Sequence, residues 1–193
     1  LRILSGASAI IAEGEVLQLG TQYNLQTSLE NYLAVIKGKT AALFAAACKV
    51  GPVIAEQNQE TIDCLHDFGM NIGMAFQIVD DVLDYSVLQE TIGKNIGDDF
   101  REGKMTAPII YSLDNATDKE RAFWERTIKD KVQKPEDFKE AQKIILEYGA
   151  LEKSLSLAKN YRDQAVKALE KLPSSTFKDP LISLADYTIH RNR

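Results

Sequence analysis

The stretch GMAFQIVDDVLDY, residues 73–85, says most about this chain. Its first half is apolar, as in a buried helix, yet its second half holds three carboxylates, Asp80, Asp81 and Asp84. Residues four apart lie nearly above one another on a helix, so Asp80 and Asp84 share a face, with Gln77 one turn earlier. Like charges at this spacing repel each other. We therefore expect a ligand outside the helix to offset the repulsion, and a hard divalent cation is the natural candidate.

Magnesium suits these side chains. It prefers oxygen ligands and usually binds one or two carboxylates together with water and substrate phosphates. A solvated acidic surface is the alternative, but such a surface normally follows mixed polar residues, whereas residues 72–79 are mostly apolar. The chain also lacks the loop pattern of an EF-hand. The pattern favours Asp80, Asp81 and Asp84 as Mg2+ ligands.

Two glycines, Gly69 and Gly73, lie on the same stripe of this helix as the acids. A glycine inside a helix costs about 1 kcal/mol relative to alanine, so the bare stripe needs a reason. It indicates either room for a ligand or close packing of a neighbouring helix, and the spacing does not distinguish the two.

Helical periodicity runs through almost the whole chain, and no segment shows convincing strand alternation. We expect helices over residues 1–19, 27–48, 58–85, 106–113, 119–131, 135–148, 151–172 and 180–190. Thr27 to Glu30 fits a capping box for the second helix, and we expect Pro52 in the first turn of a new segment after that helix. Residues 91–103, rich in Gly, Asp and Asn, predict a loop or broken helix. The sequence predicts an all-α fold and a single helical domain, 1–193.

Composition narrows the class of protein. With 45% hydrophobic and 26% charged residues, the chain reads as soluble and globular, and its net charge of −5 argues against a nucleic-acid binder. No stretch predicts a transmembrane segment or a signal peptide. Cys48 and Cys64 lack metal-type spacing and are expected as reduced thiols of a cytoplasmic protein. The chain starts at Leu1 within a helical pattern without a capping residue, so we expect a segment upstream.

Cationic residues form two further candidate elements. Lys94 and Lys104 follow the acids on a glycine-bearing segment that can fold back over the helix end, and lysine suits phosphate oxygens. Lys39 and Thr40 stand inside an apolar helix, where we expect the Thr40 hydroxyl to bond the Ile36 carbonyl and bend the helix. Each element alone is as well explained by a solvated surface. Together with a carboxylate-held metal, they predict a diphosphate site.

Near the end of the first helix, Glu13, Glu15 and Gln18 allow two interpretations, a solvated helix end or polar contacts at a cavity rim. Spacing does not decide between them. His66 and His190 lack any partner pattern and receive no catalytic role.

In its motifs the chain resembles the C-terminal part of the trans-isoprenyl diphosphate synthases, above all the long-chain polyprenyl members. The matching stretches are EGEVLQL at 13–19, YLAVIKGKTAALF at 32–44, GMAFQIVDDVLDY at 73–85, GK at 93–94, Asp99 and REGKMTAP at 101–108. Asp98 departs from the pattern, since relatives often carry a basic or neutral residue there, and we expect little effect. The resemblance implies an isoprenoid-synthase-type helical bundle whose N-terminal helices are missing from this chain.

The same resemblance implies a function, the extension of an allylic diphosphate by isopentenyl diphosphate to a trans-polyprenyl diphosphate for a quinone side chain. Asp80, Asp81 and Asp84 would hold Mg2+. The diphosphate would be bound by Lys39, Lys94 and Lys104. Thr40 and Gln77 would line the developing allylic cation, and the catalytic set would comprise Lys39, Thr40, Gln77, Asp80 and Asp81. A homodimer is expected.

The resemblance also implies a gap. The family carries two aspartate-rich motifs that face each other, and no second D-D-x-x-D occurs in this chain. We therefore expect these residues alone to be inactive. Two alternatives stay open, a non-catalytic helical subunit of a heteromeric synthase and a terpene cyclase. A scaffold subunit would not need the acids and lysines, and a cyclase would usually carry a different metal triad in place of Asp80–Asp84.

Overall fold

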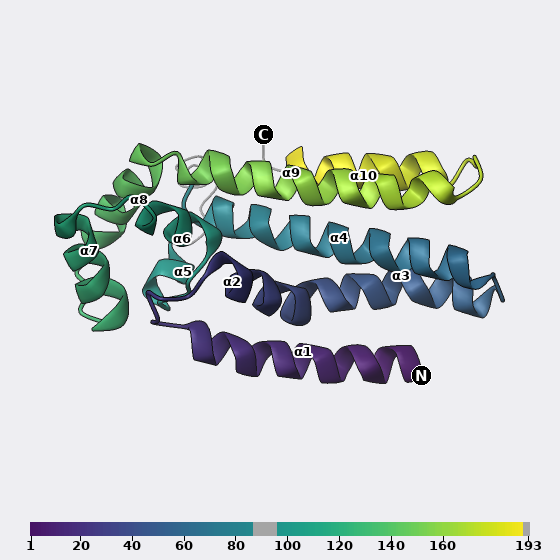
Figure 1. Cartoon of the computed structure of the whole chain (residues 1–193), viewed down its shortest axis with the longest axis horizontal. Helices are drawn as coiled ribbons and strands as arrows, with labels where there is room; N and C mark the ends of the chain where they lie inside the picture. The colour runs from purple at the N-terminus through teal and green to yellow at the C-terminus, as the bar shows by residue number, and fades with distance from the viewer. Residues whose placement is uncertain (87–95, 191–193) are drawn as a thin grey trace.

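Every regular element of the part that the computed structural model describes, residues 1–86 and 96–190, is helical, which confirms the all-α prediction (Figure 1). In chain order the elements are α1 (Arg2–Thr21), α2 (Leu29–Ile36), the π-helical turn η1 (Lys37–Ala41), α3 (Ala42–Ile54), α4 (Gln59–Asp84), α5 (Asp98–Arg101), α6 (Ala107–Leu113), α7 (Asp118–Trp124), the π-helical turn η3 (Glu125–Lys129), α8 (Asp137–Glu147), α9 (Ala150–Ala168), the 3-10 turn η4 (Leu169–Lys171) and α10 (Lys178–His190). The single-domain boundary stays a prediction.

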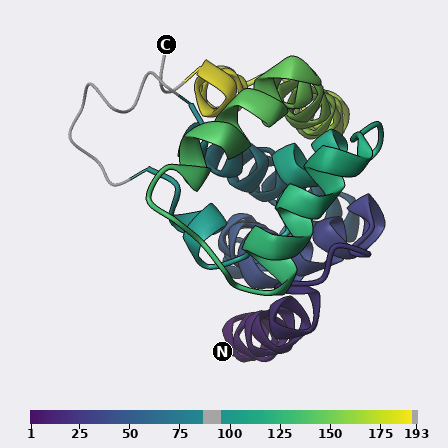
Figure 2. The same cartoon turned by 90° about the vertical axis from the view of Figure 1, so that its left-hand side faces the viewer.

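The central element is α4, the helix that ends in the acidic run. It packs between α3 and α9, with α1 on one side of the bundle and the α9–α10 pair on the other (Figures 1 and 2). The short helices α5 to α8 gather at one end of the long helices, where α4 terminates (Figure 1). This arrangement follows from the sequence of α4, because apolar residues on several faces favour burial from several sides. Ala75 and Ile78 are fully buried.

Aromatic side chains close the end of the bundle where α4 stops. Phe100 of α5 lies 6.3 Å from Trp124, 6.5 Å from Phe123 and 6.0 Å from Phe138, measured between ring centroids. Phe100 and Trp124 are almost wholly buried. Aromatic packing of this kind fixes the short α5 against α7 and α8, so the segment that follows α4 has a defined place.

At the glycine stripe of α4, the structure shows close helix packing. A Cβ on Gly73 would lie 2.5 Å from the Ala41 Cα, and a Cβ on Gly69 would lie 2.5 Å from the Phe44 carbonyl oxygen. Side chains at these positions would force the two backbones apart. The stripe therefore serves packing between α4 and the η1–α3 helix, which the sequence alone had left open.

Two predicted boundaries around α2 and α3 are wrong. Ser28, not Thr27, caps α2, because its hydroxyl accepts the Asn31 N–H at 3.1 Å, while the Thr27 hydroxyl donates to the Thr21 carbonyl at 3.1 Å. Pro52 does not open a new segment, since α3 continues through it to Ile54. A proline in the last turn of a helix removes only one intrahelical hydrogen bond, so the helix can run on briefly.

The expected bond from Thr40 back to Ile36 is also wrong. The helix is interrupted by the π-helical turn η1, and the Thr40 hydroxyl donates to Gln77 Oε1 of α4 at 2.8 Å. On its other side η1 is crowded by α1, because a Cβ on Gly14 would collide with the Gly38–Lys39 backbone. Single π-helical turns inside α-helices are frequent at functional sites. This one carries Lys39, which contacts Gln18 of α1, and Thr40, which contacts Gln77 of α4.

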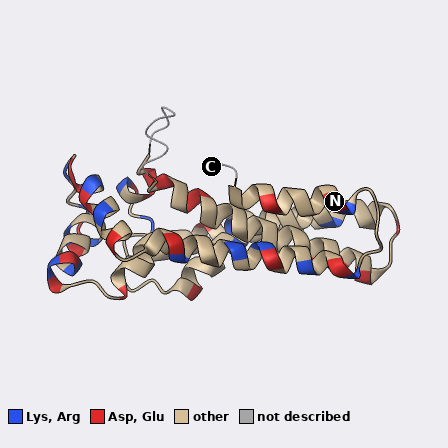
Figure 3. Ribbon diagram, turned by 90° about the horizontal axis from the view of Figure 1, so that it is seen from above, with Lys and Arg blue, Asp and Glu red and all other residues tan. Residues whose placement is uncertain are grey.

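Surface properties follow the composition. Acidic and basic residues are interspersed along the helices in the view of Figure 3. None of the helices that the structure describes combines the length and hydrophobicity that a bilayer crossing needs. Cys64 is buried and Cys48 half-buried, and neither forms a disulfide.

The packing at Gly73 predicts the effect of one methyl group. We expect Gly73→Ala to lower the free energy of unfolding by about 1–3 kcal/mol, the usual cost of overpacking, despite the higher helix propensity of alanine. Urea denaturation followed by circular dichroism measures this change. The matched control is Gly6→Ala in α1, where a Cβ would meet nothing within 4 Å. Equal stability of the two variants would contradict the role of Gly73 in close packing.

Candidate functional site

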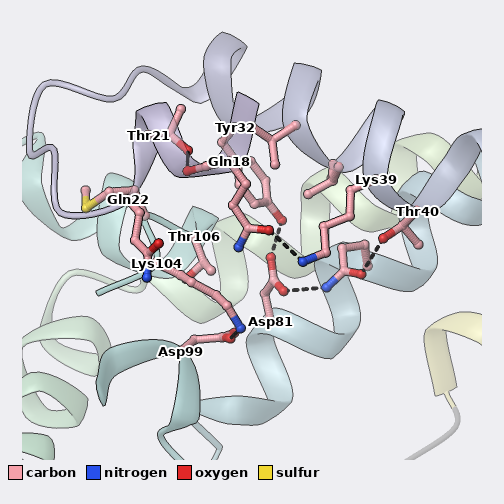
Figure 4. A pocket seen from close by; sticks show the side chains of 14 residues that line it. Gln18, Thr21, Gln22, Tyr32, Lys39, Thr40, Asp81, Asp99, Lys104 and Thr106 are labelled. Atoms are coloured by element: carbon pink, nitrogen blue, oxygen red, sulfur yellow. Dashed lines mark hydrogen bonds and ion pairs between the residues drawn. The ribbon is translucent and has the colours of Figure 1, made fainter. Parts of the chain in front are cut away.

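The candidate site is a cavity of about 70 Å3 at the acidic end of α4. Its walls come from the end of α1, from α2 and η1, from α4, and from the segment that leads from α5 to α6 (Figure 4). The lining residues are Gln18, Thr21, Gln22, Tyr32, Val35, Ile36, Lys39, Thr40, Gln77, Asp81, Asp99, Lys104, Met105 and Thr106. Figure 4 shows Lys39 and Lys104 reaching the cavity with the Asp81 carboxylate between them in this view. Five of the predicted site residues thus line one space: Lys39, Thr40, Gln77, Asp81 and Lys104.

A chain of hydrogen bonds crosses the floor of this cavity. The Thr40 hydroxyl donates to Gln77 Oε1 at 2.8 Å, and Gln77 Nε2 donates to Asp81 Oδ1 at 2.8 Å. The Tyr32 hydroxyl donates to the other oxygen, Asp81 Oδ2, at 2.6 Å. An ionised Asp81 only accepts, so in that form it fixes which end of the Gln77 amide faces it. The carbonyl oxygen of Gln77 therefore faces Thr40.

Burial dominates the electrostatics of Asp81. The side chain is 4% exposed, and burial, reinforced by the nearby Asp99 carboxylate, raises the pKa of Asp81 to about 8. Hydrogen bonds from Tyr32 and Gln77 act in the opposite direction and favour the charged form. Burial, followed by the charge of Asp81, also raises the pKa of Tyr32. The proton that Tyr32 donates to Asp81 is thus held firmly by the phenol.

The ammonium group of Lys39 is anchored to α1. Lys39 Nζ lies 2.6 Å from Gln18 Oε1 and 3.2 Å from Glu15 Oε1. This decides between the two interpretations of the end of α1, since Gln18 and Glu15 make polar contacts at the cavity rim. Glu13 is exposed and does not line the cavity.

The ammonium group of Lys104 is held by two acids, 2.9 Å from Asp99 Oδ1 and 2.7 Å from Glu102 Oε2. Burial alone would lower the pKa of Lys104, but the hydrogen bonds to Glu102 and Asp99 outweigh it and raise the pKa above its usual value. Burial raises the pKa of Asp99, although Lys104 counteracts it. Lys104 is therefore a permanently charged cation at the cavity.

The three acids at the C-terminal end of α4 have different contacts in this structure. Asp81 points into the bundle, toward Tyr32 and Gln77. Asp84 caps α5: its Oδ1 accepts the N–H groups of Gly97 at 3.0 Å and Asp98 at 3.2 Å, and its Oδ2 accepts that of Asp99 at 2.9 Å. Burial, then the charge of Asp99, raises the pKa of Asp84 against these hydrogen bonds. Asp80 is exposed.

The donor set determines how well the residues fit a metal. No group of three or more acidic, His or Cys side chains is gathered for a metal ion within residues 1–86 and 96–190. Mg2+ commonly needs only one or two protein carboxylates, with water and phosphate oxygens as its other ligands. Asp80 fits that pattern best, because it is exposed, whereas Asp81 is buried and Asp84 caps α5. Lys94 lies outside the described residues.

Several residues of the cavity were not among the predicted site residues, and Tyr32 and Asp99 are two whose side chains bond predicted ones. Tyr32 stands seven positions, two helical turns, before Lys39, which is a usable signal for a shared face. Asp99 stands five positions before Lys104 in the glycine-bearing segment. The ion pair between Asp99 and Lys104 cannot be predicted from helical periodicity, since the segment that joins them is irregular.

Known proteins resemble this chain in sequence and in fold. The sequence profile of the family described as Polyprenyl synthetase matches residues 1–145. The octaprenyl diphosphate synthase of Haemophilus influenzae is 38% identical over 192 residues, which cover 100% of this chain and 58% of that protein. A crystal structure of a decaprenyl diphosphate synthase from Rhodobacter capsulatus has a TM-score of 0.94 and 47% identity, covering 100% of this chain and 59% of the other.

A polyprenyl synthase from Caulobacter crescentus, crystallised with calcium and isoprenyl diphosphate, has a TM-score of 0.95 and 44% identity, with the same two coverages of 100% and 59%. The fold is thus that of the isoprenyl diphosphate synthases. The chain belongs to the polyprenyl synthetase family, which confirms the resemblance found in its motifs. It spans somewhat less than three fifths of the length of these relatives, 58% and 59%.

The raised pKa of Asp81 predicts a pH dependence of stability. The folded state keeps this proton up to about pH 8, whereas an unfolded aspartate loses it near pH 4. The folded state therefore binds the extra proton between these values, and its stability falls as the pH rises from about 4 to about 8. We expect Asp81→Asn to reduce that fall, measured as the free energy of unfolding at pH 5 and pH 8 without divalent cations.

Asp81→Asn also replaces one of the two accepting oxygens with an amide donor, which faces either Gln77 Nε2 or the Tyr32 hydroxyl and lowers stability at every pH. The informative quantity is therefore the difference between the two pH values. Asp63→Asn, at an exposed carboxylate on the same helix, is the control and should leave the difference unchanged. A full-sized fall in the Asp81→Asn variant would show that Asp81 titrates normally.

Proposed function

We propose that this chain is part of a Mg2+-dependent trans-polyprenyl diphosphate synthase, which extends an allylic diphosphate with isopentenyl diphosphate. One observation carries the proposal. A single cavity collects two lysines, Lys39 and Lys104, beside the hydrogen-bonded pair Thr40 and Gln77 and the buried Asp81. Cations next to neutral oxygen atoms suit a reaction in which a diphosphate leaves and positive charge develops on carbon.

The lysines would bind the diphosphate and stabilise it as it departs. Both ammonium groups are already placed by protein oxygens, Lys39 by Glu15 and Gln18 and Lys104 by Asp99 and Glu102. Preorganised charges of this kind cost little rearrangement when the substrate arrives, so they act more strongly on the transition state than flexible surface lysines. Diphosphate oxygens would share these donors or replace the carboxylates.

The oxygen atoms of Thr40 and Gln77 would face the allylic carbon. Gln77 Nε2 is occupied by Asp81, so the amide presents its oxygen end toward Thr40. The negative end of this dipole favours the developing allylic cation over the neutral substrate. Attack by isopentenyl diphosphate and loss of a proton would then add one five-carbon unit.

Asp80, assisted by Asp84 and Asp81, would hold Mg2+ against the diphosphate. The metal, when bound, would neutralise charge on the leaving group. Lys94 belongs to the same proposal through the family motif. The homodimer, the cytoplasmic location and the quinone side chain as destination also stay predictions.

The exposed acid Asp80 gives a direct test in the full-length synthase. We expect Asp80→Ala to lower kcat/KM for the allylic substrate by about two orders of magnitude or more, the usual loss when a group that stabilises a leaving anion is removed. The melting temperature should stay within a few degrees, since Asp80 is not buried. Asp67→Ala, also an exposed acid on α4, is the matched control. Near-normal turnover of Asp80→Ala would refute the assignment.

The 193 residues alone are expected to form no polyprenyl product, because they contain one D-D-x-x-D and the family uses two. Incubation of the isolated chain with an allylic diphosphate, isopentenyl diphosphate and Mg2+, followed by chromatography of the dephosphorylated products, tests this. Linear products longer than the allylic substrate would show that the aspartate-rich motif absent from these residues is dispensable. Hydrocarbon products would favour a terpene cyclase.

A further inference from the structure

Three residues with left-handed backbone conformation meet beside the cavity. Tyr23, between α1 and α2, has φ 61°, Lys131, after η3, has φ 59°, and Gly103, immediately before Lys104, has φ 65°. Only glycine adopts this conformation without a steric cost, so Tyr23 and Lys131 are strained. Strained residues persist where their surroundings hold them firmly, and they cluster at functional sites.

The contacts of Tyr23 show what holds it. Its N–H donates to the Gly103 carbonyl at 2.9 Å, and the Gln22 side-chain amide donates to the Glu102 carbonyl. The Tyr23 ring lies against Gly103 so closely that a Cβ on Gly103 would collide with it. Lys131 Nζ lies 3.7 Å from the centre of the same ring, a cation–π contact. The turn after α1 is thus held against the turn before Lys104 by the Tyr23 N–H, the Gln22 side chain and the Tyr23 ring.

A second support reaches the same segment from the residues after η3. Gln133 Nε2 donates to the Phe100 carbonyl at 2.9 Å and to the Thr127 carbonyl at 3.0 Å. The Gly103 N–H donates to the Phe100 carbonyl at 3.0 Å, and the Lys104 N–H donates to the Asp99 carbonyl at 2.9 Å. The backbone on both sides of Lys104 is therefore tied down.

We propose that Tyr23 is a positioning residue for Lys104. By holding the Gly103 carbonyl and packing against its Cα, Tyr23 sets the direction in which the next residue leaves the backbone. The Lys104 ammonium then falls at the cavity, between Asp99 and Glu102. Tyr23 itself does not line this cavity, so its effect passes through the turn. This inference rests on the proposed function, in which Lys104 binds diphosphate.

The test is the binding of inorganic diphosphate with Mg2+ to the full-length protein, measured by calorimetry for Tyr23→Ala, Lys104→Ala and the double variant. We expect each single variant to weaken binding by about tenfold or more, the effect of misplacing a binding group. The double variant should bind no more weakly than Lys104→Ala, since residues that act as one unit are not additive. Tyr23→Phe should bind with wild-type affinity, because the contacts of Tyr23 use its ring and its backbone N–H, which phenylalanine keeps.

Two further variants separate positioning from folding. Tyr23→Gly relieves the backbone strain and keeps the N–H but lacks the ring, so weak diphosphate binding with an unchanged melting temperature supports positioning by the ring. Tyr187→Ala, at an exposed tyrosine on α10, should change neither quantity.

The outcomes also separate the two proposals. Additive losses in the double variant, or wild-type affinity in both Tyr23→Ala and Tyr23→Gly, would overturn the positioning role while the diphosphate role of Lys104 stands. Wild-type affinity of Lys104→Ala would overturn the diphosphate role, and the positioning role with it.

Discussion

The site depends on the close contact between α4 and the helix formed by η1 and α3. Gly69 and Gly73 let the two backbones approach so closely that any Cβ on either glycine would collide with the neighbour. This approach brings the Thr40 hydroxyl within 2.8 Å of Gln77 and the Tyr32 hydroxyl within 2.6 Å of Asp81. Hydrogen bonds are short-ranged, so a bulkier stripe on α4 would separate the partners. The close packing of α4 against η1 and α3 is therefore also what brings the hydrogen-bonding partners of the site together.

Irregular backbone supplies the rest of the geometry. The π-helical turn η1 carries Lys39, whose ammonium contacts α1, and Thr40, whose hydroxyl contacts α4. The left-handed Gly103 turns the chain so that Lys104 faces the same cavity. In both places the departure from regular structure lies next to a lysine. The regular helices form most of the cavity wall, and the irregular turns carry Lys39 and precede Lys104.

The acidic run shows how tertiary contacts differentiate residues of one type. Asp80, Asp81 and Asp84 form one motif in the sequence, yet Asp81 is buried among donors, Asp84 caps α5 and Asp80 is exposed. Burial raises the pKa of Asp81 and of Asp84. A shared motif therefore does not imply a shared role, because contacts with α2 and α5 give Asp81 and Asp84 different surroundings.

The all-α fold, the approximate helix boundaries and a common location for Lys39, Thr40, Gln77 and Asp81 could be predicted from the sequence, and the structure places these four residues around one cavity. Hydrophobic periodicity is a local signal, and it survives into the folded chain. Three contacts became visible only in the folded structure: Ser28 caps α2, Thr40 bonds Gln77 instead of Ile36, and the Tyr23 N–H bonds the Gly103 carbonyl. These contacts join residues far apart in the chain, or choose between two adjacent hydroxyl groups, Thr27 and Ser28, that can both accept the N-cap hydrogen bond. Their energies depend on which helices lie next to each other, and no local pattern contains that information.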